Sequence, residues 1–147
     1  MSEPDPDLDA IFDLIQNEFH HVDRQLGSHG QRHLAIAAIP KLARDLYLVH
    51  DIVAITCNAG IGAWIHYHHD EPGWLKYAGR AFTRIGHPQV SADLKNCHAV
   101  YLKKGDAMTY QDTDAPSRYL WDHEHKIMRS LHAYLLAHGF PFPNQPA

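Results

Sequence analysis

The stretch WIHYHHDEPGW, residues 64–74, contains three histidines, two acidic residues and two tryptophans. On a helix His66 lies one turn from both His69 and Asp70, so imidazole and carboxylate groups could bind zinc together. Alternatively, histidines in the last turn of a short helix interact favourably with its negative end and with solvent. A zinc protease would normally carry His-Glu-x-x-His, which this sequence lacks. We therefore favour the helix-end interpretation and predict no metal ligand here.

Pairs of an acidic residue and a histidine three positions later are a second pattern that could bind metal. Helical bundles with two metal ions use Glu-x-x-His because residues three apart project to the same side. The sequence offers Glu18 with His21, and Asp122 with His125. With seventeen acidic residues, each having roughly a one-in-ten chance of a histidine at that spacing, about 1.6 pairs arise by accident. The two pairs therefore do not indicate a di-metal site.

Other catalytic patterns are missing from the sequence. It contains neither a glycine-rich phosphate loop nor a Gly-x-Ser-x-Gly motif. Cys57 and Cys97 lie in helix-like surroundings, where a free cysteine is usually a small buried hydrophobe. Cys97 and His98 are consecutive, so on a helix they point apart. We predict no catalytic residue and no cofactor.

The composition limits the classes of partner. The formal net charge of the 147 residues is −4, opposite to that of a domain that grips nucleic acid directly. The longest apolar stretches fall short of the ~20 residues that a membrane span requires. The acidic start MSEPDPDLDA lacks the basic and apolar segments of an export signal. We expect a soluble, cytoplasmic protein that contacts neither nucleic acid nor a membrane.

The histidines must be positioned by helices, because apolar residues recur at steps of three and four and no stretch alternates like a strand. Pro40 should break or kink the second helix, Ser117 should cap the last, and 104–116 should form a loop. We predict an all-α fold, with one domain of six to seven helices over 1–147 and flexible ends at 1–6 and 141–147. The expected helices cover 5–26, 34–57, 61–69, 74–85, 88–101 and 117–138.

Two turns and the short helix between them give the middle of the chain a recognisable pattern. A helix ends in Asn-Ala-Gly, a short aromatic helix follows, and a later helix ends in Ile-Gly before the next begins. With these features, 39–94, and more loosely 117–140, resembles a family of small bacterial proteins that includes a DNA mimic protein. In the family the turn reads Asn-Gly-Gly, and glutamine often stands at the position of Ala63. The residues that carry the resemblance are Asn58, Ala59, Gly60, Trp64, Ile65, Ile85 and Gly86.

The resemblance implies a helical fold and a protein partner. The mimic of that family is acidic and dimeric and occupies the DNA-binding face of a transcriptional regulator. Mimicry of this kind needs carboxylates spaced like phosphates, on the order of one charge per 1.7 Å of duplex. Candidate acidic patches here are the residues from Glu3 to Asp13, and Asp106, Asp112 and Asp114.

We therefore expect a non-enzymatic protein-binding module that acts as an inhibitor, an immunity-type protein or a DNA mimic. Its partner would be a toxin or a transcriptional regulator, and it would act as a monomer or a homodimer. Trp64 should face inward, with the histidines at the surface rim. The alternative is a histidine-rich metal-binding protein or metal-dependent enzyme that adds His123 or His125 to the cluster; a third is a pH response of several imidazoles. The residues expected to contact the partner are Trp64, His66, His68, His69, Asp70 and Glu71.

Overall fold

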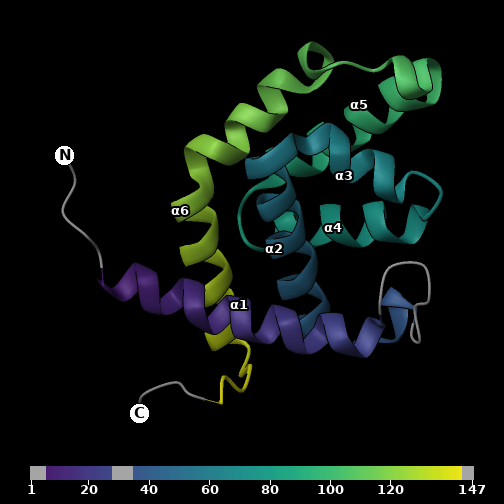
Figure 1. Ribbon diagram of the computed structural model, residues 1–147. Coiled ribbons are helices and arrows are strands. Elements are labelled where there is room, and N and C mark those ends of the chain that lie inside the picture. The colour runs from purple at the N-terminus through teal and green to yellow at the C-terminus, as the bar shows by residue number, and fades with distance from the viewer. Residues whose placement is uncertain (1–5, 28–34, 144–147) are drawn as a thin grey trace.

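A computed structural model describes residues 6–27 and 35–143, which form six α-helices and three short 3-10 turns around one hydrophobic core (Figure 1). None of these residues lies in a strand. The all-α prediction is therefore confirmed. In chain order the helices are α1 (Pro6–Leu26), α2 (Lys41–Ala59), α3 (Ile61–His68), α4 (Pro72–Arg84), α5 (Pro88–Lys104) and α6 (Asp114–Ala137), and the 3-10 turns are η1 (Ile36–Ala38), η2 (Gly105–Ala107) and η3 (Tyr110–Thr113).

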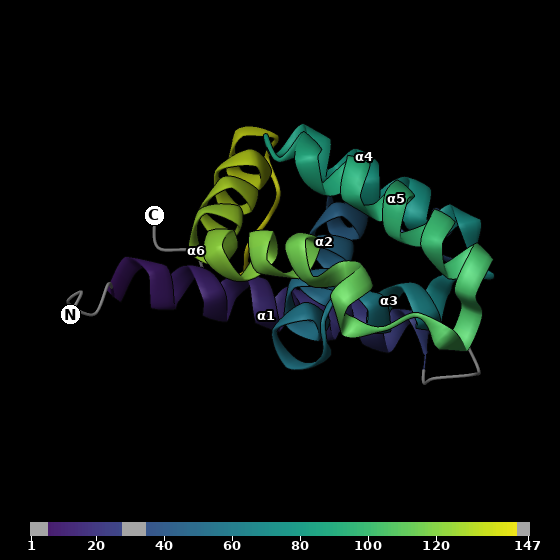
Figure 2. The ribbon, with the colours of Figure 1, turned by 90° about the horizontal axis from the view of Figure 1, so that it is seen from above.

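Helix α2 is the central element. It packs against α1, α3, α4 and α6, and Figure 1 shows it running through the middle of the molecule with α1 crossing one of its ends. Helices α4 and α5 lie side by side on one flank (Figure 2). Within the described residues, no helix combines the length and the apolar character that crossing a bilayer demands.

In most helices the buried face is the one that the apolar periodicity of the sequence predicts. In α1 the apolar stripe includes the buried residues Ile15 and Val22, and the break at Pro40 becomes a short 3-10 turn followed by α2. Gly86, with φ of +91°, ends α4, and Pro88 begins α5. The flexible ends expected at 1–6 and 141–147 fall mostly outside the described residues.

Three sequence predictions are wrong in their details. The stretch 104–116 is not an open loop but contains η2 and η3, and α6 begins before Ser117. Ser117 is buried inside α6 and its hydroxyl accepts a hydrogen bond from the backbone N–H of Ile61 at 3.1 Å, so it caps α3 instead. Cys57, expected in the core, is exposed near the C-terminal end of α2.

A buried ion pair joins three helices. The carboxylate of Asp45 in α2 is fully buried, and Nη1 of Arg84 in α4 lies 2.9 and 3.2 Å from its two oxygens. The hydroxyl of Tyr134 in α6 donates to the same carboxylate at 3.2 Å. Burial raises the pKa of Asp45 above its ordinary value, while Arg84 and Tyr134 lower it. The ionised form of the Asp45 carboxyl group is therefore stabilised by both Arg84 and Tyr134.

Removal of Arg84 should destabilise the fold. In Arg84→Gln the buried carboxylate of Asp45 loses its cation, which we expect to lower the free energy of unfolding by about 3 kcal/mol in urea denaturation. The matched control is Arg80→Gln, one turn earlier on the same helix, where the arginine is exposed. Equal losses in the two variants would contradict a structural role for the ion pair.

His50 is held in an apolar contact between α1 and α2. Its ring lies 4.3 Å from that of Phe19, and its buried Nδ1 has no hydrogen-bond partner among the described residues. Burial, and secondarily the charge of His20, lower the pKa of His50 from 6.5 to about 4. The folded state therefore holds this imidazole neutral.

The stability of the protein should depend on pH through His50. Between pH 6.5 and about 4 His50 binds a proton in the unfolded chain but not in the folded chain. The free energy of unfolding is therefore unaffected by His50 above this window and falls by about 3 kcal/mol as the pH decreases across it. In His50→Gln this fall should shrink, whereas in the control His125→Gln, at an exposed position, it should persist. Urea unfolding at several pH values measures the difference, and parallel curves for wild type and His50→Gln would contradict it.

Candidate functional site

The histidine-rich stretch divides between the core and the surface. Trp64 faces inward, as expected, and its Nε1 donates to Oδ2 of Asp51 at 2.9 Å. Because it is fully buried, it has no surface for a partner, and its prediction as a partner contact is wrong. His68 is only 4% exposed, so its predicted place at the surface rim is wrong. The reason is its position four residues after Trp64, which puts both side chains on the inward face of α3.

His68 is enclosed by aromatic rings and carboxylates. Its ring stacks on Trp74, with centroids 4.2 Å apart and an interplanar angle of 10°, and lies 4.7 Å from Trp64. Its Nδ1 is 3.1 Å from Oε1 of Glu71, and its Nε2 is 3.8 Å from Oδ2 of Asp51. These contacts join α3 to α2 and to the start of α4, so they support the fold and leave little of His68 for a partner.

The remaining polar residues of the stretch lie outside the core. His66 and Asp70 are exposed, and His69 is half-buried with its Nδ1 2.7 Å from the backbone oxygen of His66. Among the described residues, no three side chains of histidine, cysteine, aspartate or glutamate gather closely enough to hold a metal ion. The structure therefore does not bring His66 or His69 together with His123 or His125 in a metal centre.

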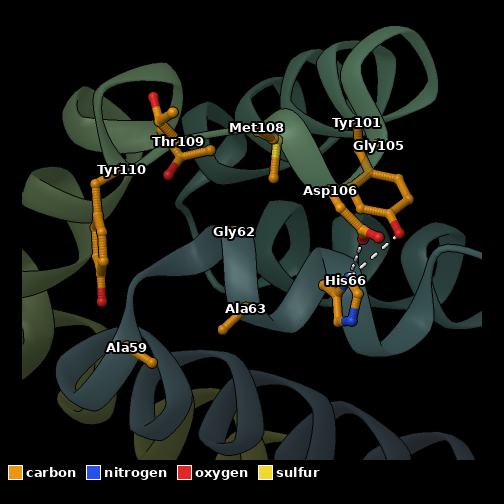
Figure 3. A pocket seen from close by; sticks show the side chains of 11 residues that line it. Ala59, Gly62, Ala63, His66, Tyr101, Gly105, Asp106, Met108, Thr109 and Tyr110 are labelled. Carbon is orange, nitrogen blue, oxygen red and sulfur yellow. Dashed lines mark hydrogen bonds and ion pairs between the residues drawn. The ribbon is translucent and has the colours of Figure 1, made fainter.

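His66 instead forms part of a pocket of about 270 Å³ between the α2–α3 turn and the segment that follows α5 (Figure 3). Ala59, Gly62 and Ala63 provide a wall of small residues on one side. On the opposite side, η2, η3 and the residues between them line the pocket. The remaining lining residues are Tyr101, Gly105, Asp106, Met108, Thr109, Tyr110 and Thr113.

One end of the pocket is polar. Nδ1 of His66 is 3.2 Å from the hydroxyl of Tyr101 and 3.8 Å from Oδ1 of Asp106 (Figure 3). Asp106 is 92% exposed, so its carboxylate contacts solvent as well as the imidazole. This end can both donate and accept hydrogen bonds to a group that enters the pocket.

The other end is aromatic and sits against the α2–α3 turn. Tyr110 is 64% exposed, and its ring lies 3.0 Å from the position that a Cβ on Gly60 would take. A Cβ on Gly62 would approach the methyl group of Met108 at 3.2 Å. Beside the same turn, the half-exposed Trp121 donates its Nε1 to the backbone oxygen of Thr56 at 2.9 Å. Small residues in the turn therefore let large side chains pack closely around it.

The other predicted turn residues have local roles. Asn58 is exposed and its side-chain amide donates to the backbone oxygen of Ala54 at 3.0 Å. Gly60, with φ of +80° and ψ of 159°, ends α2 and precedes α3. Only glycine adopts this conformation readily. Gly86 performs the corresponding role after α4.

Neither cysteine has the environment of a nucleophile. The pKa of Cys57 is raised mainly by burial and secondarily by the carboxylate of Glu124, which lies 3.7 Å from the sulfur of Cys57. Burial also raises the pKa of Cys97 to about 11. Reactive cysteines need a depressed pKa, so neither thiol is activated as a nucleophile, and only Cys97 is part of the core.

The acidic residues around η3 are neutralised by nearby cations. Lys104 lies 2.7 Å from Asp112, and this bond, with hydrogen bonds from Thr109, lowers the pKa of the Asp112 carboxyl group. Arg118 pairs with Asp114 at 3.0 Å. The predicted acidic patch at 106–114 therefore does not present an uninterrupted row of free carboxylates.

Sequence reasoning missed most of this pocket. Asp106 was predicted only as part of an acidic patch. Tyr101, Met108 and Tyr110 were not predicted as site residues, because Tyr101 fits a helix and the polar composition of 104–116 indicates a loop. A usable signal was the pair Met108 and Tyr110, which are large apolar side chains in an otherwise polar stretch.

Comparisons with known proteins found no relative of this chain. No family model, no curated protein and no solved structure matches the chain. The site must therefore be interpreted from its own geometry.

Gly60→Ala should destabilise the protein by about 1–3 kcal/mol, because alanine is strained in this backbone conformation. Gly86→Ala is the matched control, since Gly86 also has positive φ but no heavy atom near its added Cβ. Only Gly60→Ala should displace the ring of Tyr110, which Tyr fluorescence or the NMR signals of its ring would report. Unchanged Tyr110 signals in Gly60→Ala would contradict the close contact.

Proposed function

We propose that the protein is a non-enzymatic binding module that docks on another protein through the pocket between the α2–α3 turn and η3. The observation that carries the proposal is the combination of a pocket with small-residue walls, the exposed ring of Tyr110 at one end and the His66–Tyr101–Asp106 group at the other. Interfaces concentrate their binding energy in such pockets, where aromatic side chains are enriched.

The size of the pocket favours a protein partner over a free small molecule. Sites for small molecules occupy roughly 300–1,000 Å³ and enclose most of the ligand. A pocket of about 270 Å³ is better matched to one inserted side chain of a larger partner. An apolar side chain with a polar tip would fit, because Met108 lines the middle and His66 offers hydrogen bonds at one end.

The kind of partner follows from the family resemblance, which points to a toxin or a transcriptional regulator. An inhibitor or immunity-type role agrees better with this site than DNA mimicry does, because Asp112 and Asp114 already pair with cations. We place the activity in the cytoplasm, and the two unpaired cysteines, Cys57 and Cys97, are compatible with a reducing compartment.

Two substitutions should weaken docking, one by removing a contact and the other by filling the pocket. Tyr110→Ala removes the exposed ring, and Ala63→Phe fills the pocket. In affinity capture from cells of the source organism, followed by titration of the purified partner, each should weaken binding by roughly tenfold or more. Tyr67→Ala is the matched control, since Tyr67 is equally exposed, at 62%, but does not line the pocket.

The same variants test self-association. If the partner is a second copy, wild type should sediment as a dimer in analytical ultracentrifugation and Tyr110→Ala as a monomer. A partner that binds wild type, Tyr110→Ala and Ala63→Phe with the same affinity would refute docking through this pocket. The absence of any partner that distinguishes these variants, together with a monomeric wild type, would refute it as well.

A further inference from the structure

A second and larger concavity lies between α4 and α5. It encloses about 720 Å³ and shares no lining residue with the docking pocket. The two helices pack side by side (Figure 2). Their approach is close because Gly79 has no side chain, and a Cβ there would lie 2.8 Å from the hydroxyl oxygen of Ser91. Gly79 and Ser91 both line this α4–α5 groove, at the point where the two helices approach closely.

The walls of the α4–α5 groove carry positive charge from both helices. Lys76, Arg80 and Arg84 line it from α4, and their spacing of four residues places them on one face, about 6 Å apart along the axis. Lys95 and His98 line it from α5. No carboxylate is among the lining residues that the structure describes.

Three of these cations are available to a ligand. Arg84 is committed to Asp45, but Lys76, Arg80 and Lys95 are exposed and take part in no ion pair within the described part of the chain. Repulsion between neighbouring unpaired cations raises the free energy of the unliganded protein. An anion that binds between them relieves this repulsion. The groove therefore has the electrostatics of an anion site.

The size of the groove and the overall charge select the kind of anion. A volume of about 720 Å³ lies within the range of small-molecule sites. A long polyanion such as nucleic acid would extend beyond the groove over a molecule with net charge −4, whereas a small anion would remain within it. Leu75, which is half-buried, adds apolar surface to the lining.

We propose that the α4–α5 groove binds a small molecule with two or three linked phosphates, such as a nucleoside di- or triphosphate. The guanidinium of Arg80 offers paired N–H donors that match phosphate oxygens, and Lys76 and Lys95 supply point charges from the two walls. Leu75, which is half-buried, then contacts the organic part of the ligand. The docking proposal is independent of this site.

The test is isothermal titration calorimetry of the full chain at low ionic strength with inorganic tripolyphosphate. Wild type should bind it saturably with one site. The variant Lys76→Gln, Arg80→Gln, Lys95→Gln should bind about 100-fold more weakly or not at all, because charge-assisted hydrogen bonds are lost. The control variant Lys41→Gln, Lys103→Gln, Lys126→Gln removes the same charge from exposed positions outside the groove and should keep the wild-type affinity.

Further titrations identify the source of the phosphates. A nucleoside triphosphate that binds more tightly than tripolyphosphate indicates a nucleotide, and equal affinities indicate an inorganic oligophosphate. Thermal unfolding followed by circular dichroism verifies that each variant is folded, and the single variant Arg80→Gln replaces the triple variant if the latter is not. The proposal is overturned if wild type shows no saturable binding, if both triple variants lose affinity equally, or if only an acidic peptide such as oligoglutamate binds.

Discussion

The buried carboxylate of Asp45 is the constraint on which the arrangement of the helices depends. A charge removed from water is costly unless cations and hydrogen-bond donors surround it. The guanidinium of Arg84 and the hydroxyl of Tyr134 meet that need only if α4 and α6 hold fixed positions against α2. A second contact, in which the guanidinium of Arg44 lies 3.9 Å above the ring of Tyr77, joins α2 to α4 again. The orientation of α4, and with it the α4–α5 groove, is therefore set from the core.

The docking pocket depends on a different local requirement, the sharp turn between α2 and α3. Gly60 allows the chain to change direction within one residue, and Ser117 satisfies the first backbone N–H of α3 from a distant helix. Because Ser117 lies shortly after η3, the same hydrogen bond positions the segment that carries Tyr110 over the turn. The pocket is thus formed by two parts of the chain that are about fifty residues apart, and it exists only when α6 is packed in place.

Periodicity explains why the fold could be predicted from the sequence and the pocket only in part. Apolar spacing identifies the buried face of each helix, and glycine and proline mark its ends, so the positions of Gly60, Gly86 and Pro88 were informative. Periodicity does not say how far neighbouring helices extend, and Cys57 is exposed because it lies near the end of α2. For His68 the relevant signal was present, since it follows Trp64 by four residues, but its polarity suggested the surface. Buried imidazole is acceptable there only because Glu71 and Asp51 provide polar partners.

The net charge of −4 does not describe the local charge of each surface, because opposite charges are separated in space. Exposed acidic residues lie along α1, including Asp9 and Asp13, whereas unpaired cations gather on α4 and α5. At physiological ionic strength, exposed charges more than about 8 Å apart are largely screened from one another. A ligand inside the α4–α5 groove therefore responds to Lys76, Arg80 and Lys95, while a polyanion tens of ångströms long would meet the acidic remainder of the surface. The same average charge that argues against nucleic acid thus leaves room for a small phosphorylated ligand.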